Sequence, residues 1–187
     1  MRFLTIFLFS AFIFGVVSCN RVTSADDLKR IMEMEKRVNE ARLHPPQFAE
    51  DINLFPFQEL AINYQDFVDK YPEAKECPDL LFKAGEIYSQ ELGEIPRAIE
   101  LFTRCYQQFP DQKAAPHALF LIAYLYNNSL KNYERAGENY RLFLEKYPNH
   151  ELSKSARFEI EQMGISPEKL LKNITSQNAE DSVKSPK

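Results

Sequence analysis

The side chains best suited to chemistry are few in this chain and lie far apart. Its cysteines and histidines, three of each, are Cys19, Cys77, Cys105, His44, His117 and His150. No histidine stands at metal-ligand spacing from a cysteine or an acid, so each is expected alone on the surface. The sequence has no glycine-rich phosphate loop, and no nucleophile can be paired with a base. We therefore expect a protein that is not an enzyme, needs no cofactor and has no metal site.

Cys19 has the most informative sequence around it. A basic start at Arg2 is followed by a largely apolar stretch of 15 residues, which is shorter than the ~20 residues needed to span a bilayer. The end of this stretch, Val16-Val17-Ser18-Cys19, resembles a bacterial lipobox. The resemblance implies that residues 1–18 are a signal peptide and that acylated Cys19 anchors the protein to a membrane. The alternative is an ordinary cleaved signal in which Cys19 is incidental; lipidation is the favoured interpretation.

Composition favours an all-α domain. The chain has 187 residues, a length expected for one domain. Beyond residue 18 it holds only 4 valines and 3 threonines, a poor supply of β-branched residues for a sheet. The formal net charge is −4, and removal of residues 1–18 would leave 22 basic against 27 acidic side chains. This charge gives no electrostatic reason to bind nucleic acid, so no nucleic-acid partner is expected.

A 38-residue repeat fills the middle of the chain. The aromatic-proline pairs Tyr71-Pro72, Phe109-Pro110 and Tyr147-Pro148 recur at this interval. The same shift aligns Leu60/Ala98/Ala136, Tyr64/Phe102/Tyr140, Phe67/Cys105/Phe143, Leu81/Leu119, Gly85/Ala123 and Tyr88/Tyr126. The spacing within each unit follows one helical face, so each unit is predicted to be two amphipathic helices joined by a turn.

This pattern resembles the tetratricopeptide repeat (TPR). The resemblance implies a TPR-type solenoid of helical hairpins, with two clear repeats of 38 residues and degenerate flanking units. Small residues at Gly85 and Ala123 would let the first helix of each hairpin approach the second, and proline would end the second helix. In this family the first helices line the concave face. The long turns after each proline resemble those of TPR lipoproteins of the bacterial envelope, of the BamD-like and Tol–Pal coordinator types.

The segments on either side of the repeats are expected to differ from them in structure. Residues 19–54 hold the lipidated cysteine, a tether and an N-terminal helix, which is expected over 24–42 and pairs with 57–71. Its start is assigned to a capping box from Ser24 to Asp27, and its apolar side to Leu28, Ile31, Met32 and Val38. Residues 55–165 form the TPR-like array, closed by a cap helix in which Arg157 and Glu161 face outward. Residues 166–187 are expected to form a short helix and a flexible tail.

Five side chains are candidates for partner binding: Phe82, Glu86, Phe120, Tyr124 and Phe158. The three phenylalanines share one position of successive first helices. They could form an aromatic ladder that grips an extended peptide, or they could pack inside the array. Packing is slightly favoured, because three exposed phenylalanines would form a conspicuous patch. Glu86 and Tyr124 lie one turn further along the same face and are better contact candidates, since the core does not need them.

Two asparagines and two cysteines within the repeats could also have a functional role. Asn127 and Asn128 could bond a ligand backbone, but capping or solvating a helix end is favoured. Cys77 and Cys105 are expected at the same end of one unit, so a disulfide between them is one alternative. Cys105 stands at a small-residue core position, and the favoured interpretation is therefore a buried free thiol.

The expected function is that of a lipid-anchored adaptor. Located in the outer membrane and facing the periplasm, it would bind other envelope proteins through its concave face. Outer-membrane protein assembly ranks first by analogy, and peptidoglycan or cell-division coordination ranks second. A different class, glycan or small-ligand binding in the groove, is disfavoured by the lack of tryptophan and of paired acids. Asn20, rather than aspartate, resembles the residue that follows the lipid cysteine in outer-membrane-directed lipoproteins.

Overall fold

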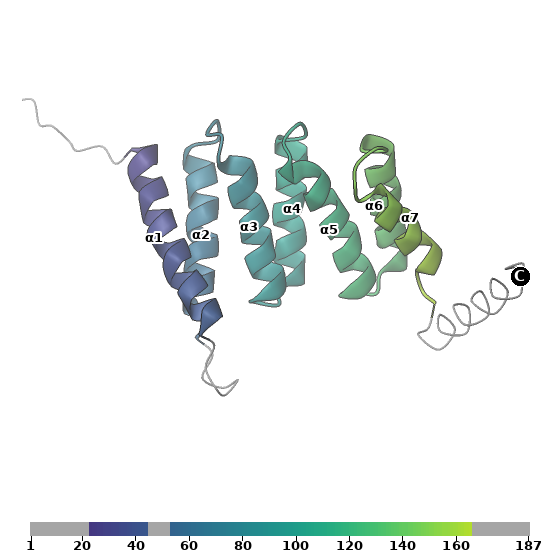
Figure 1. Ribbon diagram of the computed structural model, residues 1–187, viewed down its shortest axis with the longest axis horizontal. Coiled ribbons are helices and arrows are strands. Elements are labelled where there is room, and N and C mark those ends of the chain that lie inside the picture. The colour runs from purple at the N-terminus through teal and green to yellow at the C-terminus, as the bar shows by residue number, and fades with distance from the viewer. Residues whose placement is uncertain (1–22, 45–52, 166–187) are drawn as a thin grey trace, which may run out of the picture.

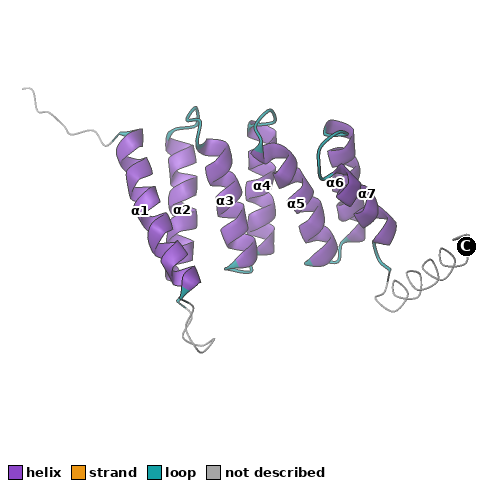
Figure 2. Ribbon diagram, in the orientation of Figure 1, coloured by secondary structure: helices purple, strands orange, loops and turns teal. Residues whose placement is uncertain are grey.

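The computed structural model describes residues 23–44 and 53–165, which form helices and no strand (Figure 2). The helices are α1 (Ser24–Leu43), α2 (Phe55–Lys70), α3 (Cys77–Gln90), α4 (Ile95–Gln108), α5 (Ala114–Asn128), α6 (Tyr133–Lys146) and α7 (Ser153–Gln162). They lie side by side in chain order from α1 to α7, and each packs against the next (Figure 1). This is the all-α solenoid of helical hairpins that the repeat predicts.

Several predicted segments lie outside the described residues. These are the signal peptide over 1–18, Cys19 with the start of the tether, residues 45–52, and the short helix and tail over 166–187. Within 23–44 and 53–165, the longest and most apolar helices still fall short of what a membrane crossing requires.

The second helix of each hairpin ends in the same way. The helices α2, α4 and α6 stop at Tyr71, Phe109 and Tyr147, whose backbone N–H groups donate to the carbonyl four residues earlier at 2.8, 3.1 and 2.8 Å. Proline follows each aromatic residue, and because it has no N–H and a fixed φ it cannot continue the helix. The aromatic-proline pair therefore marks a real helix end in all three places.

The turn between the helices of a hairpin is also repeated. Gly93, after α3, has a φ of 68°, and Lys131, at the equivalent place after α5, has a φ of 51°. The residue before each one, Leu92 or Leu130, donates its N–H to a carbonyl five residues earlier, at 3.1 and 3.0 Å. Both hairpins thus use one residue in the left-handed region, which glycine adopts freely and lysine at a cost.

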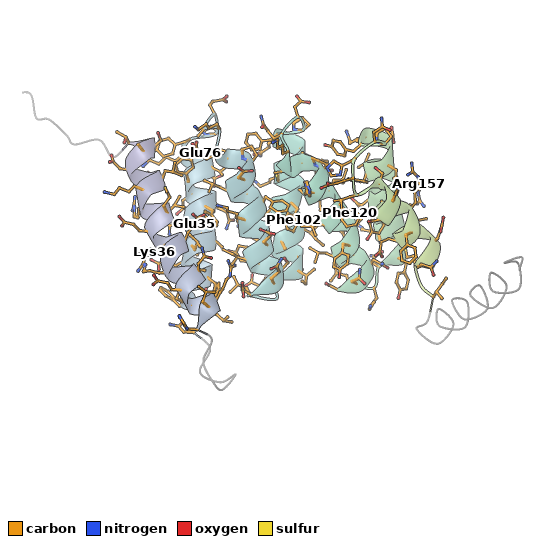
Figure 3. The ribbon with its side chains drawn as sticks, in the orientation of Figure 1. Glu35, Lys36, Glu76, Phe102, Phe120 and Arg157 are labelled. Atoms are coloured by element: carbon orange, nitrogen blue, oxygen red, sulfur yellow. The ribbon has the colours of Figure 1, made fainter. Side chains whose placement is uncertain are left out.

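The core runs along the inside of the stack, and the two helices of the first repeat lie close together at Gly85. A Cβ on Gly85 would lie 2.6 Å from the ring of Phe102, on the facing helix α4. Ala123, the equivalent residue of α5, is fully buried. The close approach predicted at Gly85 is present, and Ala123 lies in the core as the alignment requires. Figure 3 shows Phe102 and Phe120 in the middle of the stack.

The capping box of α1 begins one residue earlier than the sequence suggested. The cap is Thr23, not Ser24: the Thr23 hydroxyl accepts from Asp26 N–H at 3.3 Å, and Asp26 accepts from Thr23 N–H at 2.9 Å. The buried face follows the helical spacing of Asp27, Ile31, Met34 and Val38. Met32 is 60% exposed, so its predicted place on the apolar side is wrong. It points away because it directly follows Ile31 on a helix that turns about 100° per residue.

Asp27 joins α1 to the end of α2, as the expected pairing of these helices requires. Its carboxylate accepts from Lys70 Nζ at 2.7 Å and from the Tyr71 hydroxyl at 3.0 Å, and it also pairs with Arg30. The hydrogen bond from Lys70, more than any other contact, lowers the pKa of Asp27, although burial opposes the shift. A buried carboxylate at this place is tolerated because it is paired with cations and hydrogen-bonded.

The last described helix, α7, lies where the cap helix is expected. Arg157 and Glu161 are both exposed on it, and Figure 3 shows Arg157 at the outer end of the stack. Ala156, on the inner side, is fully buried against the second repeat. Ala156 therefore lies on the packed side of α7, and Arg157 and Glu161 lie on its exposed side.

Candidate functional site

The helices α1, α3, α5 and α7 are the first helices of successive hairpins, and together they form what we call the first-helix face. A polar pocket of about 200 Å³ opens on it between α1 and α3, with α2 as its floor. Its lining comprises Glu35, Asn39, Arg42, Leu60, Tyr64, Lys83, Glu86 and Ile87. One of the predicted site residues, Glu86, is among them.

Glu35 is the centre of a charged network in this pocket. Its Oε1 accepts from the Tyr64 hydroxyl at 2.6 Å and from Lys83 Nζ at 2.7 Å. Burial favours the neutral carboxyl, but the hydrogen bonds from Lys83 and Tyr64 outweigh it and lower the pKa of Glu35. Figure 3 shows Glu35 on α1, so the network connects all three helices that surround the pocket.

Arg42, in the last turn of α1, also lines the pocket. Its Nε donates to Glu91 Oε1 at 2.8 Å, and another nitrogen donates to Asn39 Oδ1 at 3.3 Å. The Arg42–Glu91 ion pair joins the last turn of α1 to the end of α3. The basic group, although exposed, is therefore bound at the pocket by two acceptors.

Glu86 differs from the other charged residues of the pocket. Within residues 23–44 and 53–165, no hydrogen bond or ion pair reaches its side chain, which is half-buried. Burial raises its pKa, and the neighbouring charges of Arg42 and Lys83 only partly oppose the rise. A partly desolvated carboxylate without a bonding partner is suited to accept an N–H group or a cation from a ligand.

Phe82 and Phe120 pack within their own hairpins. The Phe82 ring lies 5.4 Å from the ring of Phe102, and the Phe120 ring lies 5.5 Å from Tyr140 and 5.7 Å from Phe143. Both side chains are half-buried. Their geometry is that of aromatic pairs that hold the first helix of each hairpin to the second.

Tyr124 and Phe158 are the exposed members of the predicted set. Tyr124 on α5 is 42% exposed and Phe158 on α7 is 56% exposed. Neither lines the polar pocket, which lies at the other end of the first-helix face. The structure thus divides the five candidates into two packed rings, one pocket carboxylate and two exposed aromatic side chains.

The floor of the first-helix face between α5 and α7 contains a polar group without a partner. The Tyr140 hydroxyl is buried and makes no hydrogen bond within the described residues. Burial raises the pKa of Tyr140 well above its usual range. Nearby, Asn127 is buried and donates from Nδ2 to Glu159 Oε2 at 3.0 Å, so it joins α5 to α7, which the sequence did not suggest. Asn128 donates to the Tyr124 carbonyl at 3.2 Å and serves the helix end as expected.

Both described cysteines are buried free thiols, as the favoured interpretation held. Cys77 Sγ donates to the Tyr71 carbonyl at 3.1 Å, and Cys105 Sγ donates to the Pro78 carbonyl at 3.4 Å. Burial raises the pKa of Cys105 to about 12. A thiol that stays protonated and out of solvent is a poor nucleophile, so these cysteines are packing residues.

The histidines are not all solitary, and that prediction is wrong for two of them. The ring of His117 lies 5.0 Å from the ring of His150, and His117 Nε2 is 3.5 Å from Glu151 Oε1. The spacing argument failed because His117 and His150 are far apart in the chain and meet only when one repeat stacks on the next. His44 caps the C-terminus of α1 and is exposed.

Most of the polar pocket was missed from the sequence. Glu35, Asn39 and Arg42 stand at helical spacing on α1, which would have placed them on one face. That signal was available, but α1 has no counterpart in the 38-residue alignment, so nothing showed that this face points towards α3. Tyr64 and Lys83 were within the aligned region, but their roles depend on Glu35.

Comparison with known proteins agrees with the architecture. The sequence model of the tetratricopeptide repeat family matches residues 79–111 and 117–150, which cover most of α3 with α4 and of α5 with α6. These two segments are therefore similar to tetratricopeptide repeats, units that build modules for protein–protein interaction. Comparison with curated proteins found no match.

Proposed function

We propose that this protein is a non-catalytic adaptor that binds a segment of a partner protein along its first-helix face. The observation that carries the proposal is Glu86, a half-buried carboxylate without a bonding partner in the described residues, on the face that also exposes Tyr124. The other acid of the pocket, Glu35, is already bound by Tyr64 and Lys83. Glu86 is thus the acceptor that remains for a ligand.

The chemistry of the face indicates the kind of segment that would bind. Glu86 would accept a basic side chain or a backbone N–H, and Tyr124 would supply a flat amphipathic surface further along the stack. A peptide with a cationic residue followed by apolar residues fits this order. Binding of this type uses a preformed face and a few anchors, with the remaining contacts excluding water.

The test combines Glu86→Lys with Tyr124→Ala. Removal of an aromatic anchor together with reversal of the acceptor charge should weaken partner capture by about 2 kcal/mol or more, roughly 30-fold. Partners would be captured on immobilised protein, identified, and titrated against wild type and variant. The variant should remain folded, because neither side chain is part of the packed core, with a modest loss of melting temperature from the added cation beside Arg42 and Lys83.

The matched control carries the same two kinds of change on α6. Tyr133 is 44% exposed, nearly the same as Tyr124, and Glu138 is exposed on the same helix. Tyr133→Ala with Glu138→Lys should leave capture unchanged. If the α3/α5 variant binds as tightly as this control, binding does not use the first-helix face and the proposal fails.

We also propose that the adaptor is attached to the outer membrane by lipid on Cys19 and faces the periplasm. The support for this attachment is the lipobox-like sequence that ends at Cys19. The first candidate pathway is outer-membrane protein assembly, and the second is peptidoglycan or cell-division coordination. Cys19→Ala should abolish membrane association without changing the helical content. A Cys19→Ala protein that still sediments with membranes after a high-salt wash would contradict the lipid anchor.

A second candidate function is the binding of a glycan or a small polar ligand in the pocket between α1 and α3. The observation that favours it is the presence of two acids, Glu35 and Glu86, in one pocket, which the sequence did not predict. Titration with peptidoglycan fragments distinguishes the two candidates. Glycan retention that Glu86→Lys removes, without any captured protein, would favour the pocket ligand over the adaptor.

A further inference from the structure

His117, His150 and Glu151 meet where the second repeat joins α7. His117 lies in the first turn of α5, and His150 with Glu151 lies in the turn between α6 and α7. One possible ligand atom from each side chain falls in a group whose members all lie within 4.8 Å of one another. We propose that these three residues bind a divalent ion of the zinc class, with water completing its coordination.

The hydrogen bonds of His117 fix which of its nitrogens faces the acid. Nδ1 lies 3.0 Å from the Lys113 carbonyl oxygen, an acceptor, so Nδ1 carries the proton. In the neutral ring Nε2 is then an acceptor, and it lies 3.5 Å from Oε1 of Glu151, which is also an acceptor. Two acceptors at this distance can share one cation, and a metal ion bound between them would satisfy both lone pairs.

The distance between the two acceptors suits a metal ion. Two ligands on a tetrahedral zinc ion lie about 3.3 Å apart when each bond is about 2.0–2.1 Å long, close to the 3.5 Å observed between His117 and Glu151. Two imidazoles and a carboxylate are a known zinc set when the fourth position is left to water. The bond from Nδ1 to a backbone carbonyl is the outer contact that metal-bound histidines usually make.

His150 is held near the site by packing, and its ring would have to reorient to ligate. Its ring lies 5.0 Å from that of His117 and 5.7 Å from that of Phe143. Its Nδ1 accepts a long hydrogen bond of 3.3 Å from the Leu152 N–H, which ligation would break. The turn itself is fixed, because the Ser153 hydroxyl donates to the Tyr147 carbonyl at 2.8 Å.

The three ligands are particular to this junction of the array. One repeat earlier, the equivalent positions carry Asp79, Gln112 and Lys113. A lysine there takes the place of the carboxylate and opposes a cation. Repeat packing therefore brings these positions together, whereas the ligand chemistry arises only between α5 and α7, where a bound ion would fasten the last helix to the array.

The experiment titrates the purified chain, without a histidine tag, with Zn²⁺ by calorimetry and with Co²⁺ by visible absorption. Variants are Glu151→Gln and His117→Gln, and the control is His44→Gln, which changes an exposed histidine remote from the cluster. We expect wild type and control to bind one ion with a raised melting temperature, and both cluster variants to lose affinity at least tenfold. Glu151 is exposed, so circular dichroism of Glu151→Gln should show an unchanged fold.

Two outcomes would overturn the proposal. If wild type takes up neither ion at pH 7.5, the cluster of His117, His150 and Glu151 is not a metal site and the proposal fails. If the cluster variants bind as tightly as His44→Gln, the ion is held elsewhere. Neither outcome touches the proposed binding of a partner, since Glu86 and Tyr124 are intact in every variant.

Discussion

Between α1 and α3 the floor tyrosine, Tyr64, donates its hydroxyl to Glu35 at 2.6 Å, whereas between α5 and α7 the equivalent Tyr140 hydroxyl has no partner among the described residues. Lys83, which shares the Glu35 oxygen, corresponds two repeats later to Glu159, which accepts from Asn127 instead. The repeat thus places a buried tyrosine ring beneath the first helices at both ends of the array. Whether the hydroxyl of this tyrosine makes a hydrogen bond depends on which side chains the neighbouring first helices present to it.

The difference gives the two ends of the first-helix face different binding chemistry. The α1–α3 end is a charged pocket in which hydrogen bonds already fix Glu35, Lys83 and Arg42. The α5–α7 end exposes aromatic surface through Tyr124 and Phe158. A ligand that spans the face would therefore place polar groups towards α1 and apolar groups towards α7.

The largest expected effect separates packed from exposed aromatic side chains at one repeat position. Phe120→Ala should cost about 2–4 kcal/mol of unfolding free energy, because it removes ring contacts with Tyr140 and Phe143 and leaves a cavity. Phe158→Ala should stay within about 0.5 kcal/mol, because this side chain is exposed. Urea denaturation of both variants measures the difference, and equal losses would show that the position has one role throughout the array.

The floor tyrosines give the next largest contrast. Tyr64→Phe should cost about 1–2 kcal/mol, because it removes a hydrogen bond to a partly buried carboxylate, whereas Tyr140→Phe should be neutral or stabilising by up to about 1 kcal/mol. The folded state lowers the pKa of Glu35, so the associated stability is present above the unfolded value and is lost as pH falls through the folded one. The Tyr64→Phe penalty should therefore shrink below about pH 4. Thermal melts at pH 7 and pH 3.5 test both statements.

The hairpin turns extend the comparison to the backbone. Gly93→Ala should cost about 1 kcal/mol, because alanine is strained at the positive φ that glycine adopts there. Lys131→Gly, at the equivalent turn, should gain about 0.5 kcal/mol, because it relieves the same strain in lysine. Chemical denaturation of each single variant checks the opposite signs. A loss in both would mean that Lys131 makes a compensating interaction.

The smallest expected effect concerns Glu86. The folded state raises its pKa, so the charged form destabilises the protein at neutral pH, and protonation removes this cost. Glu86→Gln should raise stability at pH 7 by a few tenths of a kcal/mol, with the gain fading towards pH 4. The same variant should bind partners more weakly. Melting and capture measured on one preparation test whether stability and binding oppose each other at this residue.

The sequence predicted the helical hairpins because their determinants are local and repeated: the aromatic-proline ends, the small residue at Gly85, and the apolar spacing. It predicted less of the candidate site because each part depends on contacts between segments that the alignment of repeats does not reveal. The pocket needs α1, which does not align with the repeat, and the pair of histidines needs two segments that stacking alone brings together. The shift from Ser24 to Thr23 at the first cap has a simpler cause, since Thr23–Asp26 and Ser24–Asp27 both fit the capping pattern.

Packing in this stack is largely between helices that are neighbours in the chain. Few loops must close over long distances before contacts form, so the described array should fold rapidly and open one helix at a time from its ends. In native-state hydrogen exchange, amides of α4 and α5 should exchange most slowly, whereas those of α7, which is short and packs mainly on α6, should exchange early. A partner that spans the first-helix face would couple these separate openings into one, and the difference in protection between α7 and α4 would fall when it binds.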